Sequence, residues 1–283
     1  MPSLLAVLAS AAWGSSDFVG AMLAKRWPPT VIVFLGFVLA STVLLLGIPL
    51  VHPPFGAYQW YGAAAGAGGV VALACFYKAM AAGPMSLVAP LSATSAAIPV
   101  LWSLARGGTV NLLQGCGILV AFIGIILASG PELRESSLVS RSTLLYTLVS
   151  AIGFGMYFIL FALGSATSVY GTLLGQRLAG VLVLAPFALR GLSSGKSLLN
   201  GLEWSPRIAS LFVFNGLGDL AANGMYGVAT RHAGSNLPVV MALSGLYPVV
   251  STVLAWGLLK ERLRAVQNIG IIAALVGVLL LNA

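Results

Sequence analysis

Long, nearly uninterrupted apolar runs dominate the chain, and short segments rich in Pro, Gly or basic residues separate them. A helix needs about 20 predominantly apolar residues to cross the hydrocarbon core of a bilayer. The runs therefore predict an all-α integral membrane fold with ten transmembrane helices. These helices are predicted at residues 3–24, 31–51, 57–80, 86–104, 112–129, 143–163, 168–189, 207–230, 236–258 and 266–282. Internal prolines in the ninth run, Pro238 and Pro248, predict a kinked or broken helix there.

Composition and charge agree with a membrane protein. Hydrophobic residues make up 59% of the chain and charged residues only 7%, whereas a typical soluble domain carries about 25% charged residues. The net charge of +8 is spread singly or in pairs between the apolar runs, so no nucleic-acid-binding surface is predicted. Because Met1-Pro2-Ser3 contains no basic residue, the first run is expected to be a spanning helix and not a cleaved signal peptide.

Basic residues are distributed unevenly between the two sides of the predicted bundle. Cytoplasmic loops of membrane proteins carry an excess of Lys and Arg. This bias predicts an inner (plasma) membrane protein whose two termini lie on the outer side. The segments after the odd-numbered helices hold Lys25, Arg26, Lys78, Arg134, Arg141, Arg190, Lys196, Arg207, Lys260, Arg262 and Arg264, and the opposite side holds Arg106 and Arg231.

Two halves of the chain share sequence marks. The pattern Q-x2-G-x6-G begins at Gln114 and again at Gln267, each time after a run that contains Pro. Five helices are an odd number, so the two halves must cross the membrane in opposite directions. We therefore predict a first repeat at 1–130, a connecting loop at 131–142, a second repeat at 143–283, and a binding site near the midplane between them. The expected hinges are Gly14, Pro99, Gly153 and Pro248.

Several segments resemble the EamA repeat of the drug/metabolite transporter superfamily. They are Trp13-Gly14-Ser15, Arg177, residues 226–230 leading to Pro248, residues 259–263, and Gln267 followed by Gly270. The resemblance extends over nearly the whole chain and implies a membrane transporter. Length and helix count are similar to those of the bacterial amino-acid exporters of this superfamily, including exporters of aromatic amino acids and methyl viologen.

Charged residues inside spans are costly in lipid, so each is a candidate for a buried pair or a cavity-facing role. Arg177 and Asp219 are expected to pair between adjacent helices, either to lock the bundle or to couple transport. Asp219 and Asp17 are also candidates for substrate binding. The alternative for Asp17 is a position near the rim with Lys25 or Arg26. Lys78 either faces the cavity or extends to the membrane interface.

Aromatic residues within the spans form a second group of candidates, because aromatic walls bind flat or cationic organic groups. Core packing is the alternative for each. Trp13, Tyr157 and Tyr247 are preferred, because each lies near mid-helix close to a Gly or Pro and helix breaks often line cavities. Asn223 and Ser244 add polar candidates, unless they only bond a neighbouring helix. The aromatic candidates are Trp13, Tyr77, Trp102, Tyr157, Phe161, Tyr226 and Tyr247.

Two further patterns concern packing and membrane contact. GxxxG spacings begin at Gly62 and Gly171, and we expect them to serve close helix packing within one monomer. Aromatic residues near helix ends are predicted to lie at the membrane interfaces. They are Trp27, Tyr58, Trp60, Trp204 and Trp256.

Together these features predict a secondary transporter that works as a monomer in the bilayer. It would export small organic metabolites through a central cavity by alternating access. The leading substrates are amino acids, in particular aromatic amino acids, and cationic drugs such as methyl viologen are further candidates. The chain contains no P-loop and no HExxH motif, so neither a cofactor, a metal site nor enzymatic activity is expected. A channel or non-transporting membrane scaffold and, less favoured, a membrane enzyme acting on lipid remain as alternatives.

Overall fold

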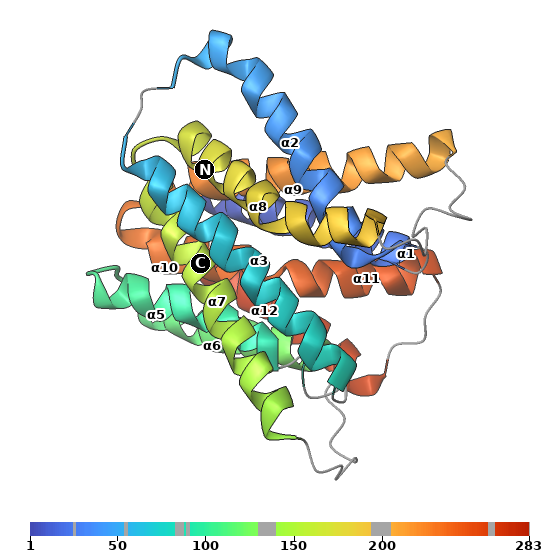
Figure 1. Ribbon diagram of the computed structural model, residues 1–283. Helices are drawn as coiled ribbons and strands as arrows, with labels where there is room; N and C mark the ends of the chain where they lie inside the picture. Colours follow the sequence, from blue (N-terminus) through green and yellow to red (C-terminus); the bar gives the residue numbers. More distant parts are fainter. Residues whose placement is uncertain are drawn as a thin grey trace.

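The computed structural model describes residues 1–24, 27–53, 56–82, 88, 91–129, 140–193, 205–259 and 264–282, and these residues contain helices and no strand (Figure 1). In the first half the helices are α1 (Pro2–Ala24), α2 (Pro29–Val51), α3 (Tyr58–Ala82), the 3-10 turn η1 (Thr94–Ala96), α5 (Ala97–Ala105) and α6 (Leu112–Ala128). In the second half they are α7 (Arg141–Ser165), α8 (Val169–Ser193), α9 (Pro206–Arg231), η2 (Gly234–Asn236), α10 (Leu237–Ser244), α11 (Tyr247–Leu259) and α12 (Ala265–Leu281).

Helices occupy all ten predicted positions, which confirms the all-α membrane fold of two inverted five-helix repeats. Polar residues start several of them: the side chains of Asn111, Ser140 and Ser205 accept hydrogen bonds from the first turns of α6, α7 and α9. Within the described residues, five segments are long and apolar enough to cross a membrane by length and hydropathy alone: Pro2–Ala24, Pro29–Val51, Arg141–Ser165, Val169–Ala188 and Gly234–Leu259.

Contacts between helices follow the symmetry expected of two related halves. The first helix of each half packs along the third helix of the other half, as α1 does with α9 and α7 does with α3 (Figure 1). The second helices, α2 and α8, pack together, and so do the last helices, α6 and α12. Exchanging the two halves therefore converts the α1–α9 contact into the α7–α3 contact and leaves the α2–α8 and α6–α12 pairs unchanged.

The shared Q-x2-G-x6-G pattern has a structural cause at the crossing of α6 and α12. The side chains of Gln114 and Gln267 each accept a hydrogen bond from the backbone N–H three residues earlier, which satisfies a free donor at the helix start. The glycines lie where the two backbones approach: a Cβ added at Gly277 would lie 2.6 Å from the Ala121 nitrogen. The repeated motif thus combines a helix cap with a close helix crossing.

The two GxxxG spacings pack against each other within the monomer, which confirms that prediction. Gly62 and Gly66 of α3 face the backbone of α8, and Gly171 and Gly175 of α8 face Tyr58 and its neighbour on α3. Small residues let membrane helices approach closely and gain van der Waals contact.

Both halves contain an interrupted helix, and the two interruptions meet. In the second half α10 ends at Ser244 and α11 begins at Tyr247, so the predicted break near Pro248 is confirmed. In the first half the turn η1 precedes α5, whose third residue is Pro99. A Cβ added at Gly245 would lie 2.9 Å from the Cβ of Ala96, which places the two interruptions in direct contact.

Burial contradicts the predicted membrane-interface position for two of the aromatics, and two others are exposed. Trp60 and Trp256 are exposed on the bundle surface. Trp27 and Tyr58 are instead buried: the Trp27 ring packs edge-on against Phe212 with centroids 5.1 Å apart, and Tyr58 fills space beside α8. Position near a helix end does not distinguish an aromatic that faces headgroups from one that packs inside the bundle. The fifth residue of the set, Trp204, lies outside the described residues.

Candidate functional site: a cavity between the two repeats

A cavity of about 770 Å³ lies between the helices of the two repeats, a size typical of small-molecule sites. Its inner wall includes Trp13 and Tyr247, near the middle of the bundle. From there its lining continues to Ala24 at the end of α1, Pro29 at the start of α2 and Leu259 at the end of α11. The cavity therefore extends from the middle of the bundle toward one end of it.

Toward the opposite end, packed aromatic rings close the space. Trp13 contacts Phe158 and Tyr226, with ring centroids 5.5 and 5.6 Å apart. Phe161 lies 6.0 Å from Tyr226, and both rings are fully buried. The Tyr226 hydroxyl donates a hydrogen bond of 3.0 Å to the Phe158 carbonyl, which fixes the ring across α7 and α9. These four aromatic side chains (Trp13, Phe158, Phe161 and Tyr226) are called the aromatic plug below.

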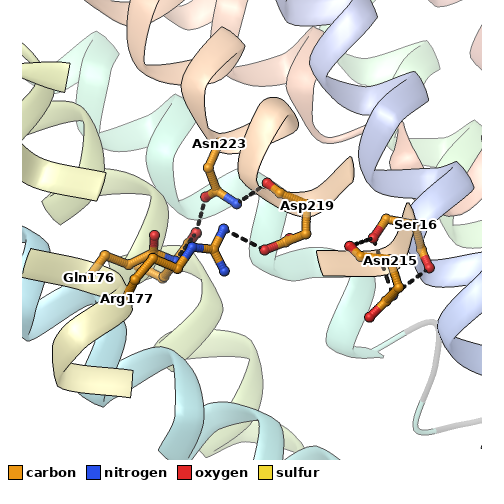
Figure 2. A network of polar contacts seen from close by, with 7 residues as sticks. Ser16, Gln176, Arg177, Asn215, Asp219 and Asn223 are labelled. Atoms are coloured by element: carbon orange, nitrogen blue, oxygen red, sulfur yellow. Dashed lines mark hydrogen bonds and ion pairs between the residues drawn. The ribbon is translucent and has the colours of Figure 1, made fainter. Parts of the chain in front are cut away.

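The expected ion pair between Arg177 and Asp219 is present in the cavity wall. Arg177 Nη2 lies 2.6 Å from Asp219 Oδ2 (Figure 2). The Arg177 side chain is only 1% exposed, whereas that of Asp219 is 32% exposed toward the cavity. The guanidinium group also lies 4.6 Å from the ring centroid of Phe37, a cation–π contact. Arg177 thus joins α8 to α9 and α2.

A hydrogen-bond network extends this pair to α7. Asn223 donates to the backbone carbonyl of Asp219 at 2.7 Å and accepts a hydrogen bond from the Tyr157 hydroxyl (Figure 2). Gln176 donates to the same hydroxyl at 3.1 Å. Asn223 is fully buried, so in this structure it joins helices and does not face the cavity. The network sets the positions of Tyr157 and Asp219, which both line the cavity.

A second polar contact, between Ser16 and Asn215, was not predicted from the sequence. The Ser16 hydroxyl donates to the Asn215 carbonyl at 2.6 Å, and the Asn215 amide donates to the Ser16 carbonyl at 2.8 Å (Figure 2). Both residues line the cavity. Neither is charged or aromatic, and they meet only because α1 crosses α9, so nothing in the local sequence identifies the pair.

The structure brings five of the predicted binding residues together. All five line the same cavity, from α1, α7, α9 and α11. They are Trp13, Asp17, Tyr157, Asp219 and Tyr247.

The remaining candidates lie elsewhere. Lys78 is exposed, with its Nζ 5.5 Å from the ring centroid of Tyr146, and Trp102 contacts Arg106. Ser244 is buried and donates to the Val240 carbonyl of its own helix. Phe161 and Tyr226 belong to the aromatic plug, and Asn223 belongs to the hydrogen-bond network. Tyr77 lies on α3, and its side chain is outside the described part of the structure.

The expected hinge residues have different surroundings. Gly14 lies against Tyr247 and Val250 of α11. Pro248 lines the cavity in the first turn of α11, and Pro99 is buried in α5. Both α1 and α7 run unbroken through their hinge glycines, and Gly153 faces Ala72 of α3. The glycine of α7 that approaches the interrupted helix of the other half is Gly155, which faces Ile98 of α5.

Two related halves around a ligand-sized cavity are the arrangement expected of a polytopic membrane transporter. The EamA-like transporter family matches residues 1–130 and 141–283. The chain therefore belongs to the EamA-like transporter family, whose members are membrane transporters of small molecules and not enzymes.

A comparison with solved structures supports the fold. A solved chain described as "Crystal structure of protein" has a TM-score of 0.73 and 15% sequence identity, and the alignment covers 99% of this chain and 95% of that chain. At this identity the likeness concerns the fold alone. No curated protein matches the chain.

Proposed function

We propose that the protein is a secondary carrier that exports small organic metabolites by alternating access. Amino acids, the aromatic ones foremost, are the proposed substrates, and organic cations such as methyl viologen are further ones. The observation that carries this proposal is the cavity itself, which extends to one end of the bundle and is closed by the aromatic plug at the other. A carrier requires a site that opens to one side at a time, and an open pore would leave no such barrier.

The basic segments support an inward-facing arrangement. The cavity lining reaches the ends of α1 and α11, and the basic segments 25–26 and 260–264 follow those helices directly in the sequence. Basic segments favour the cytoplasmic side. We therefore place this end of the cavity in the cytoplasm and both termini outside, in the inner membrane. A cytoplasmic metabolite would enter this state directly.

Release to the other side requires the aromatic plug to separate. The interrupted helices supply places where the backbone can bend, because residues between α10 and α11 lie outside both helices. The closely packed seams α3–α8 and α6–α12 favour movement of whole helices over local unfolding. In this proposal the two repeats rock around the cavity of one monomer, with the surrounding lipid in contact with its exposed apolar surface.

Ligand-dependent thermal stabilisation tests this proposal on the purified protein in detergent. Ligands that bind the folded state raise its unfolding temperature in a concentration-dependent way. We expect phenylalanine and methyl viologen to give saturable increases, and a sugar such as sucrose at the same concentration to give none beyond its general solvent effect. The absence of a saturable increase with every amino acid and organic cation tested, up to tens of millimolar, would contradict the proposal.

A further inference from the structure

The described cavity lining contains three charged side chains, and two of them neutralise each other. Arg177 and Asp219 form the ion pair described above. The third is Asp17 of α1, whose side chain is exposed in the cavity and has no hydrogen-bond or ion-pair partner among the described residues. With these groups in their usual charge states, the described lining has a net charge of −1, located on Asp17.

Two aromatic side chains of the cavity lining, Trp13 and Tyr247, lie near Asp17. Trp13 lies one helical turn earlier on the same face of α1, and Tyr247 approaches Trp13 from α11 with ring centroids 6.3 Å apart. A carboxylate beside aromatic rings matches an organic ammonium group, which gains a charge-assisted hydrogen bond from the carboxylate and a cation–π contact from the rings.

A carboxylate on the ligand has no equivalent partner. The single cation in the described lining is Arg177, which is already paired with Asp219 and is 1% exposed behind Phe37. A ligand carboxylate would have to displace Asp219 or remain unpaired in an apolar cavity, and either is costly.

We propose that the cavity selects organic monocations and that Asp17 is the counter-ion for their ammonium group. The preferred ligand is an amine with a flat, apolar body, ahead of the matching zwitterionic amino acid and well ahead of the matching anion. This proposal rests on the proposed transport function and revises the order of its substrates, because it ranks organic amines above the amino acids.

Three probes with the same phenyl body test the proposed preference for cations at neutral pH. They are 2-phenylethylamine, a cation; phenylalanine, a zwitterion; and 3-phenylpropionate, an anion. Binding to the full-length wild-type protein is measured by thermal shift and by titration calorimetry. We expect the amine to bind about tenfold or more tightly than phenylalanine, and the anion to bind weakest of the three. Equal affinities, or an order led by either carboxylate, would overturn the proposal without any variant being needed.

Substitution of Asp17 then tests whether this residue causes the preference for the amine. Asp17→Asn should weaken binding of the amine about tenfold or more while changing phenylalanine binding much less, and Asp17→Glu should restore most of the preference. Unchanged amine affinity in a monodisperse Asp17→Asn protein would refute the role of Asp17. If all three probes fail to bind the wild-type protein, both the proposed function and this inference are wrong; if they bind without a charge preference, only this inference fails.

Discussion

Replacing Arg177 with Met should destabilise the folded protein by about 3 kcal/mol. Removing one member of a buried ion pair costs about 3–5 kcal/mol, because the other charge remains without its partner. We expect the lower end of this range because Asp219 is 32% exposed in the cavity. The unfolding of the detergent-solubilised protein, followed by Trp fluorescence during a denaturant or thermal titration, measures the loss.

A control substitution and a double mutant distinguish the contribution of the Arg177–Asp219 ion pair from the general effect of replacing an Arg with Met on stability. Arg207, which is exposed in the first turn of α9, is the control, and Arg207→Met should be nearly neutral. Combining Arg177→Met with Asp219→Leu should recover part of the stability, since neither charge is then left alone. An Arg177→Met protein as stable as the wild type would show that the pair contributes nothing to the fold.

Replacing Trp13 and Tyr247 with Ala should have different consequences, although both residues line the cavity. Trp13 is buried against Phe158 and Tyr226, so its truncation should leave an internal space and cost about 3–5 kcal/mol of stability. Tyr247 is only partly buried. Its truncation should cost less stability and weaken binding of an aromatic ligand about 3- to 10-fold through the lost ring contact.

Tyr61→Ala is the control for Tyr247, because Tyr61 is exposed on α3 and does not line the cavity. It should alter neither the unfolding midpoint nor ligand binding to a significant degree. The assignment of these roles fails if Tyr247→Ala binds ligand like the wild type, or if Trp13→Ala unfolds at the wild-type midpoint.

The fold was largely predictable because lipid imposes one dominant rule. A span must be apolar and helical, so run lengths alone placed the helices, and the break near Pro248 followed from the missing amide hydrogen of proline. The repeat was visible because the cap at Gln114 and the close approach at Gly124 require the same residue types at Gln267 and Gly277. The positions of side chains relative to neighbouring helices were much less accessible.

The candidate site shows where prediction from single residues stops. The pair of Arg177 and Asp219 was foreseeable because an unpaired charge in a span is costly. The preference for aromatics beside a mid-helix Gly or Pro selected Tyr247, which lines the cavity, but it had no physical ground for excluding Tyr226, which also neighbours a Gly and is fully buried. That distinction depends on which face each helix turns toward the cavity. Helices that are apolar on all sides carry no amphipathic pattern to indicate it.

Counterflow in liposomes tests the central claim most directly. Purified protein is reconstituted into vesicles loaded with an unlabelled ligand, chosen as the probe that gives the largest thermal shift, and uptake of the same compound in labelled form is followed against protein-free vesicles. A carrier that alternates between two sides predicts uptake that saturates with concentration and is accelerated by the unlabelled compound inside. Protein-dependent flux that rises linearly with concentration and is indifferent to the internal compound would contradict the account and indicate a channel.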